Sequence, residues 1–181
     1  MKKHLLAALL GAAAINPAIA QSHNQWYGAL DSGTLNMKNT NYPDPGSMSL
    51  SAGYRFSPSF ALEGGGLFIG DSTIYTSTTS YTLRQGAVNI FAVGFLPIGQ
   101  SIELFGKAGI GFHTARVTNN LSGVYNQYTT MNPLLGLGAK FNINSRFGLR
   151  LQWESLGKAK ATESDPGADL SRLSIGGVLN F

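Results

Sequence analysis

The sequence contains no cysteine, few charged residues and no long apolar run. Without cysteine, the chain has no disulfide framework, no thiolate metal site and no cysteine nucleophile. Charged residues make up 12% of its 181 residues, against roughly 25% in soluble domains, whereas 43% are hydrophobic. Such a chain is too apolar and too poor in charge to be disordered. With 23 glycines and 10% aromatic residues, the composition favours a membrane protein whose spans are not helices.

The first 20 residues have the pattern of a cleaved signal peptide. Lys2 and Lys3 precede an apolar run over residues 5–15, and Ala18 and Ala20 form a small-x-small cleavage site. The run is too short for a membrane-spanning helix, which needs about 20 apolar residues. We therefore expect export, cleavage after Ala20 and one mature domain over residues 21–181. This domain keeps 11 of the 13 basic residues against 9 acidic ones, with no basic run, so nucleic acid is not an expected partner.

The mature sequence alternates between apolar and polar residues, with the period of two that marks a strand with two different faces. In residues 147–154, one face carries Phe147, Leu149, Leu151 and Trp153, and the other carries polar residues and glycine. The same alternation runs through residues 48–56, 60–69, 102–113, 134–141 and 172–181. It is weaker in residues 26–31 and 88–96, and in the latter we expect the face of Val88 to point outward. The pattern predicts eight strands.

The predicted connections alternate in length and consist of turn-forming residues. Long polar segments lie near residues 36–46, 70–80, 116–128 and 157–168, and short turns lie at residues 57–59, 97–100 and 142–145. In an up-and-down meander, this places the long loops at one end, and the short turns and both chain termini at the other. A β-sandwich has no reason to sort its loops in this way, whereas bacterial outer-membrane barrels have short periplasmic turns and long outer loops.

Three features predict that the apolar face points to lipid and the polar face into a barrel. Each segment supplies the ~9–11 residues of a tilted membrane strand. Glycines crowd the predicted inner face, where the narrow lumen of an eight-stranded barrel favours small residues. Aromatic residues lie near the segment ends, as an interfacial girdle requires: Trp26, Tyr27, Tyr54, Phe56, Phe60, Phe95, Phe141, Phe147, Trp153 and Phe181. Since only helices and closed barrels satisfy every backbone hydrogen bond in lipid, the sequence predicts an all-β fold, an eight-stranded antiparallel up-and-down transmembrane β-barrel.

Three stretches resemble the OmpA-type outer-membrane β-barrel family, whose small members include OmpX-like proteins and many sequences labelled porin family. They are residues 25–29 (QWYGA), residues 104–111 (LFGKAGIG) and the alternating last strand that ends in Phe181. The resemblance covers the whole mature chain. It implies a place in the outer membrane of a Gram-negative cell envelope, surrounded by outer-membrane lipid.

The resemblance also implies an assembly signal. In that family, the terminal phenylalanine and the alternating apolar residues before it are read by the barrel-assembly machinery during biogenesis. By resemblance, this role falls to Leu173, Ile175, Leu179 and Phe181. OmpA itself carries a second, periplasmic domain that binds peptidoglycan. The present chain stops at its eighth predicted strand, so we do not expect peptidoglycan anchoring.

The predicted inner face carries nine charged residues, and buried charges need partners. We therefore expect a lumen filled by ion pairs and hydrogen bonds rather than a functional site. The predicted charge network consists of Glu63, Glu103, Lys107, Lys140, Arg150, Glu154 and Arg172, with Asp31 and Arg55 on the same face. We expect Arg150 to pair with Glu63 or Glu154, and Glu103 to pair with Lys107. Because the interior of an eight-stranded barrel is just wide enough for side chains, a general diffusion pore is not expected.

The favoured function is a non-enzymatic one, in envelope structure or surface interaction. The long polar segments 71–82 and 117–130, which are rich in Thr, Ser, Asn and Tyr, suit an unknown extracellular ligand. One alternative is a barrel enzyme that acts on outer-membrane lipid, and another is a narrow channel for small solutes. A hydrolase needs a nucleophile, a base and a group that orients the base. His113 has no nearby serine, and no acid on its own face is closer than Glu103, so we predict no catalytic, cofactor-binding or metal-binding residue.

Overall fold

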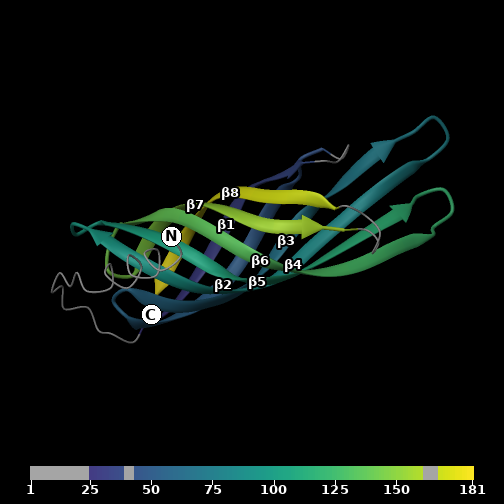
Figure 1. Cartoon of the computed structure of the whole chain (residues 1–181). Helices are drawn as coiled ribbons and strands as arrows, with labels where there is room; N and C mark the ends of the chain where they lie inside the picture. Colours follow the sequence, from purple (N-terminus) through teal and green to yellow (C-terminus); the bar gives the residue numbers. More distant parts are fainter. Residues whose placement is uncertain (1–24, 39–42, 161–166) are drawn as a thin grey trace.

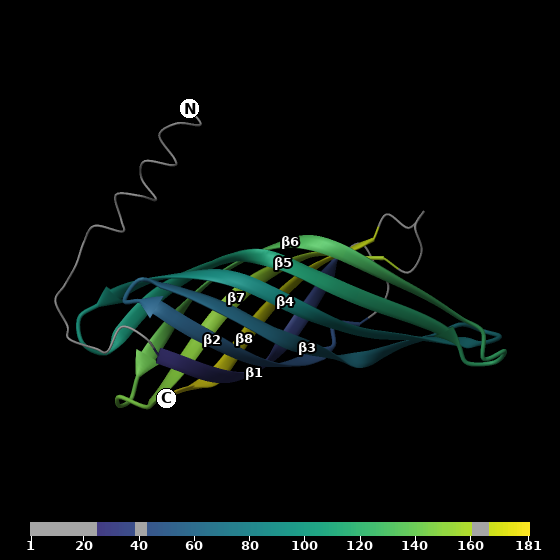
Figure 2. The ribbon, with the colours of Figure 1, turned by 90° about the horizontal axis from the view of Figure 1, so that it is seen from below.

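The structure, a computed structural model, describes residues 25–38, 43–160 and 167–181, which form eight β-strands. The strands are β1 (Gln25–Lys38), β2 (Gly46–Ser57), β3 (Phe60–Tyr75), β4 (Ser80–Ile98), β5 (Ile102–Asn119), β6 (Tyr125–Asn142), β7 (Phe147–Ala159) and β8 (Ala168–Asn180). Each strand pairs antiparallel with its neighbour in sequence, and β1 also pairs with β8, so the sheet closes into a barrel (Figures 1 and 2). The predicted fold is confirmed.

One predicted feature lies outside the described residues: the signal peptide over residues 1–20, with its cleavage site after Ala20. The described part of the chain contains no helix with the length and apolarity of a membrane span.

The two ends of the barrel differ in their connections. The three short turns follow β2, β4 and β6, as predicted, and Gly99 has the positive φ of 70° that the turn after β4 requires. Gln25 and Phe181 lie at this same end, where the Phe181 N–H donates a hydrogen bond to the Trp26 carbonyl at 2.9 Å. We call it the turn end, and the opposite one the hairpin end.

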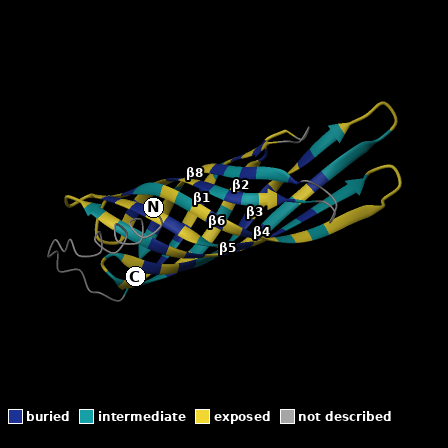
Figure 3. Cartoon of the chain, viewed as in Figure 1, coloured by how far each residue is buried: buried dark blue, intermediate teal, exposed yellow. Residues whose placement is uncertain are grey.

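Buried and exposed residues alternate along the strands of the barrel wall (Figure 3). The outward residues of the wall are largely apolar and every charged residue of the wall's middle part points inward, which inverts the pattern of a soluble sheet. Leu149, Leu151 and Trp153 of β7 are exposed, while Arg150 on the same strand is buried. In β4, Val88 and Ile90 point outward and Asn89, Phe91 and Val93 are buried, as expected for the weakly alternating segment.

The predicted aromatic girdle needs two corrections. Tyr27 is only 6% exposed, and Phe95 packs against the interior apolar cluster, so both belong to the inner face. They lie near strand ends, but position along a strand does not decide which face a residue takes. Outward aromatic residues do gather at the turn end: Trp26, Phe56, Phe60, Phe141, Phe147 and Phe181.

The segments predicted as long loops near residues 70–80 and 116–128 are largely strand. β3 continues to Tyr75 before β4 begins at Ser80, and β5 continues to Asn119 before β6 begins at Tyr125. The resulting hairpins extend beyond the rest of the barrel at its hairpin end (Figure 1). The other two long connections fall between strand ends, as predicted, after Lys38 and after Ala159.

The residue types explain why the sequence predicts loops where the chain forms hairpins. Threonine and tyrosine favour strands even where both faces are polar, and they form cross-strand pairs. The Thr73 and Thr82 hydroxyls lie 3.1 Å apart, and those of Thr114 and Thr129 lie 2.9 Å apart. The alternation of apolar and polar residues therefore ends before the backbone pairing does.

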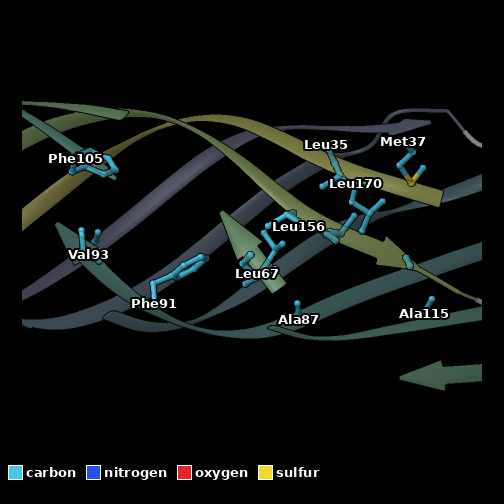
Figure 4. Packing of buried hydrophobic residues seen from close by; sticks show 14 of the residues in the cluster. Leu35, Met37, Leu67, Ala87, Phe91, Val93, Phe105, Ala115, Leu156 and Leu170 are labelled. Atoms are coloured by element: carbon cyan, nitrogen blue, oxygen red, sulfur yellow. The ribbon is translucent and has the colours of Figure 1, made fainter. Parts of the chain in front are cut away.

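The inner surface includes an apolar layer as well as charged groups. Leu35, Leu134 and Leu156 are at most 1% exposed, and Leu67 and Leu170 are 2% exposed. Figure 4 shows Leu35, Met37, Leu156 and Leu170 gathered in one part of the interior, with Phe91, Val93 and Phe105 farther along it. Each of these leucines stands at an inward position of the two-residue alternation along its strand. The sequence pattern is therefore enough to predict that they lie inside the barrel.

Candidate functional site

The middle of the barrel interior holds six charged side chains, which we call the central cluster. They are Asp31 on β1, Glu63 on β3, Lys107 on β5, Arg150 and Glu154 on β7, and Arg172 on β8. None of these side chains is more than 6% exposed. Three acidic and three basic groups balance one another, which buried charges require.

Arg150 joins two carboxylates of the central cluster. Its Nε and Nη2 donate to the two carboxylate oxygens of Asp31, both at 2.6 Å, in the bidentate geometry that gives the strongest ion pairs. Its Nη1 donates to Glu63 Oε2 at 3.0 Å, and Nη2 also reaches Ser51 Oγ at 3.2 Å. Because β3 and β7 lie on opposite walls of the barrel, this side chain ties the two walls together.

Glu63 receives two further hydrogen bonds and joins the rest of the cluster. The Tyr27 hydroxyl donates to its Oε2, and Lys107 Nζ donates to its Oε1, both at 2.8 Å. Lys107 also lies 3.6 Å from Glu154 Oε1, and Glu154 Oε2 accepts from Arg172 Nη1 at 3.2 Å. The carboxylates are thus satisfied by partners from several strands.

Glycine makes room for this cluster at one close approach. A Cβ on Gly176 of β8 would collide with the Asp31 carboxylate and with the Leu30 carbonyl on the neighbouring strand β1. The absence of a side chain at Gly176 therefore lets Asp31 reach Arg150.

A second group of charges lies nearer the turn end, and we call it the mouth triad: Arg55, Glu103 and Lys140. Arg55 Nη2 lies 3.1 Å from Glu103 Oε1, and Lys140 Nζ lies 3.4 Å from Glu103 Oε2. Arg55 also donates to the Pro58 carbonyl at 2.8 Å, and its guanidinium stacks 4.1 Å above the ring of Phe95. Two cations share one carboxylate here.

The structure places all seven residues of the predicted charge network in the interior: Glu63, Glu103, Lys107, Lys140, Arg150, Glu154 and Arg172. The expected contact of Arg150 with Glu63 is present. The expected pair of Glu103 with Lys107 is wrong, because Glu103 contacts Arg55 and Lys140 whereas Lys107 contacts Glu63 and Glu154. Residues four apart on one strand are separated by about 13 Å, so inner charges meet across strands instead.

Sequence reasoning missed several polar members of the interior. The sequence predicts Tyr27 in the aromatic girdle, whereas its hydroxyl donates to Glu63 inside the barrel. Asp31, predicted on the inner face but outside the charge network, is the bidentate partner of Arg150. Ser47 and Ser49 each accept a hydrogen bond from Arg172 at 2.9 Å. They also stand at inward positions of β2, but an uncharged serine does not by itself indicate a place in a charge network.

His113, the histidine considered for an enzyme, is 2% exposed, and its Nε2 has no hydrogen-bond partner within the described chain. Its cross-strand partners are Ala87 and Thr130, neither of which has a carboxylate to orient it. Among residues 25–38, 43–160 and 167–181, no group of three or more His, Asp or Glu side chains is placed to hold a metal ion.

A third candidate site is the sheet formed by the outer parts of β3, β4, β5 and β6, which we call the hairpin sheet. Pairing of β4 with β5 extends to Tyr81 and Asn119, whereas pairing of β2 with β3 ends at Ile69. Pairing of β6 with β7 ends at Leu135. Beyond this pair, Asn132 Nδ2 still donates to the Lys158 carbonyl of β7 at 2.7 Å, so the outer edge of β6 that no described strand contacts or pairs with runs over residues 125–131.

Solved structures of small outer-membrane barrels share this fold. Ail, the attachment invasion locus protein of Yersinia pestis, solved with the heparin analogue sucrose octasulfate, matches with a TM-score of 0.63 and 15% identity, over 88% of this chain and 100% of that one. Neisserial surface protein A matches with a TM-score of 0.62 and 16% identity, over 88% and 98% of the two chains. The N-terminal β-barrel domain of Pseudomonas aeruginosa OprF matches with a TM-score of 0.56 and 14% identity, over 87% and 99%.

At these identities the likeness concerns the fold alone. No curated protein sequence is significantly similar to the chain. The family model described as the outer membrane protein beta-barrel domain matches residues 5–181, nearly the whole chain. With its closed eight-stranded wall and inverted polarity, the chain belongs to this outer-membrane β-barrel family.

Proposed function

We propose that this outer-membrane protein has a non-enzymatic role in surface interaction and binds an extracellular protein through its hairpin sheet. The observation that carries the proposal is the outer edge of β6, residues 125–131, with which no described strand pairs. An uncovered edge presents a row of backbone donors and acceptors to which a partner strand can add. Because outer-membrane barrels have short periplasmic turns, the hairpin end faces the outside of the cell.

The side chains of the hairpin sheet support a protein partner. Tyr75 is 83% exposed, Leu121 79%, Val124 65% and Tyr125 52%. Tyrosine and exposed apolar groups are typical of protein interfaces. Ail has been solved with a sulfated sugar, but the cations of this sheet are engaged: Arg84 pairs with Asp71, and Arg116 stacks 3.7 Å above the ring of Tyr125.

A lysine on the uncovered edge should abolish this binding. Asn126→Lys places a charge on β6 beyond the wall of the barrel, and edge lysines oppose the addition of a further strand. Intact cells that display the wild-type chain are expected to bind at least one member of an array of purified extracellular proteins. Binding of that protein should fall by about tenfold or more in the variant, which corresponds to ~1.4 kcal/mol.

The matched control is Ser77→Lys, which adds the same charge to the exposed turn between β3 and β4 and leaves the edge unchanged. A second variant joins the cross-strand partners Arg116 and Gln127 through an Asn-Gly turn and so removes the tip of the β5–β6 hairpin. Equal binding by the wild type and this shortened chain to every protein in the array would contradict the proposal.

The packing of the interior argues against the two alternative functions. The central cluster and the leucines at the hairpin end fill successive parts of the lumen, which does not favour a channel for solutes. For an enzyme, His113 is buried beside Ala87 and Thr130, without the orienting carboxylate that a hydrolase base needs.

We also propose that Leu173, Ile175, Leu179 and Phe181 form the signal for the barrel-assembly machinery, after removal of residues 1–20 on export. Leu173, Ile175 and Phe181 are more than half exposed on the outer face of the last strand, where another protein has access to them before lipid surrounds the barrel. The role of Phe181 does not require strong packing in the folded barrel, since 74% of it is exposed.

Phe181→Ala is expected to lower the amount of folded barrel in the outer membrane several-fold without a matching loss of stability. The amount is measured as the band whose electrophoretic mobility changes on boiling. Phe147→Ala is the control, because Phe147 is also an outward aromatic residue of the turn end, 53% exposed. Equal losses for the two variants would show that the terminal position has no special role.

A further inference from the structure

The edge of β6 over residues 125–131, which we call the open edge, exists because β7 leaves β6 at a fixed point. The register of β7 against β8 shifts between Ser155 and Gly157, and Gly157 has a positive φ of 74°. A bulge of this kind bends the strand that carries it. A Cβ on Gly157 would collide with the side chain of Asn132 on β6, so the bend depends on glycine. A further strand that adds to the open edge would lie about 4.8 Å from β6.

The open edge lacks the residues that usually protect an exposed strand. Its sequence is YNQYTTM, with no lysine, no proline and no charged residue. Lysine and proline are the residues that commonly prevent a further strand from adding to an edge. A partner strand therefore meets no charge on the open edge itself, and the neighbouring strands decide which charge it prefers.

The charges next to the open edge do not balance. The hairpin sheet carries three charged side chains, those of Asp71, Arg84 and Arg116. Arg84 on β4 and Arg116 on β5 stand directly opposite each other, which is unfavourable for like charges. Asp71 Oδ2 lies 2.8 Å from Arg84 Nε and neutralises that arginine. The hairpin sheet therefore keeps one surplus positive charge, on Arg116.

Arg116 is placed to meet a strand at the open edge. Its guanidinium stacks 3.7 Å above the ring of Tyr125, so the charge lies over β6 although the residue belongs to β5. Stacking uses the face of the guanidinium and none of its N–H donors. Nε is enclosed without a hydrogen-bond partner in the described chain, whereas Nη1 and Nη2 are neither enclosed nor hydrogen-bonded there. The two Nη groups therefore remain for a carboxylate, which arginine binds well.

We propose that the partner of the open edge is an extended acidic segment of a protein, about seven residues long, with carboxylates on alternate residues. Its backbone pairs with residues 125–131, and one carboxylate pairs with the Nη groups of Arg116. A free sulfate or phosphate ester gains the arginine contact alone, whereas a strand also gains the backbone hydrogen bonds. The inference rests on the proposed function, because it uses the same edge and adds the chemistry of the partner.

The test measures peptide binding to the purified full barrel in a non-ionic detergent by fluorescence anisotropy. The probes are three fluorescein-labelled peptides, TETETET, TQTQTQT and TKTKTKT, which share length and alternation and differ in charge. We expect TETETET to bind, TQTQTQT to bind at least about tenfold more weakly, and TKTKTKT to bind more weakly still, since each lost charge pair costs ~1.4 kcal/mol for a tenfold change.

Two methylated forms of TETETET test whether the peptide adds as a strand. One is N-methylated on the backbone of its glutamates and the other on the backbone of its threonines. Only alternate N–H groups of a strand point to a given neighbour, so one form should lose binding and the other should keep it. Equal binding of the two forms would show that the peptide does not pair with the open edge.

Two arginine variants test the carboxylate contact. Arg116→Gln should weaken TETETET binding about tenfold and leave TQTQTQT binding unchanged. Arg84→Gln is the matched control: it gives the hairpin sheet the same net charge, but it changes a residue on β4, two strands from the open edge. Screening by salt should keep its effect below about twofold. Folding of each variant is checked by the heat-dependent change in electrophoretic mobility.

Several outcomes would overturn an acidic partner: no binding of TETETET to the wild type, equal or stronger binding of either other peptide, or equal weakening by the two arginine variants. The proposed surface interaction is tested separately. If a protein of the array binds the wild type and Arg116→Gln equally but does not bind Asn126→Lys, the open edge binds proteins without this contact. The acidic partner then fails while the proposed function stands.

Discussion

Arg150→Leu is expected to lower the free energy of unfolding by about 3–5 kcal/mol, the range found when one partner of a buried ion pair is removed. The substitution removes a bidentate contact with Asp31 and a hydrogen bond to Glu63. Glu63 keeps Lys107 as a partner, but Asp31, which is 0% exposed, loses its counter-ion. The dominant cost is therefore the uncompensated buried carboxylate. Equilibrium unfolding in denaturant, in phospholipid vesicles, measures the change.

Two further variants separate this explanation from a general effect of losing an arginine. Arg84→Leu removes an arginine from an exposed ion pair, in which the side chains of Arg84 and Asp71 are 65% and 47% exposed. Exposed pairs of this kind contribute about 0–1 kcal/mol to the free energy of unfolding. The double variant Asp31→Asn with Arg150→Leu removes the stranded charge, so it should be more stable than Arg150→Leu alone. If the double variant is the less stable of the two, the cost does not arise from the charge of Asp31.

The wall of the barrel could be predicted from the sequence because each of its determinants is local. Alternation along one strand, such as Leu149, Arg150 and Leu151, fixes which residues face outward, and each short turn fixes the next strand as an antiparallel neighbour. The extension of β3 to Tyr75 and of β6 from Tyr125 was not predicted. In these outer parts of β3 and β6, both faces of the sheet meet water. Apolar and polar residues therefore no longer alternate, and the sequence pattern does not predict that the backbone is paired.

The composition of the interior was largely predictable, but its contacts were not. Parity along each strand places Glu63, Glu103, Lys107 and Arg150 inside. Which of them touch depends on how far each strand is staggered against the next around the closed barrel, a property of the whole sheet. The stagger brings Asp31 to Arg150, 119 residues later in the chain. A spacing of four residues on one strand, as between Glu103 and Lys107, carries no such information.

The same parity makes a prediction about the outer face. Leu151→Arg places a charge on the outer surface of β7, between the outward aromatic residues Phe147 and Trp153, where Leu151 is 54% exposed. An arginine near the bilayer midplane of a barrel costs about 2–4 kcal/mol, and the cost falls toward the interfaces. We therefore expect Leu151→Arg to lower the free energy of unfolding by up to about 2–4 kcal/mol when the barrel is embedded in phospholipid vesicles.

The control for Leu151→Arg is Leu121→Arg, in the connection between β5 and β6 at the hairpin end, where the leucine is 79% exposed. Both variants exchange an exposed leucine for an arginine, and they differ only in whether lipid or water surrounds it. Leu121→Arg should therefore change the unfolding free energy by no more than about 0.5 kcal/mol, as surface substitutions usually do. Equal and small effects of the two variants in lipid would mean that the apolar face of β7 does not contact the bilayer. The exposure of its leucines would then require a protein partner along the barrel wall.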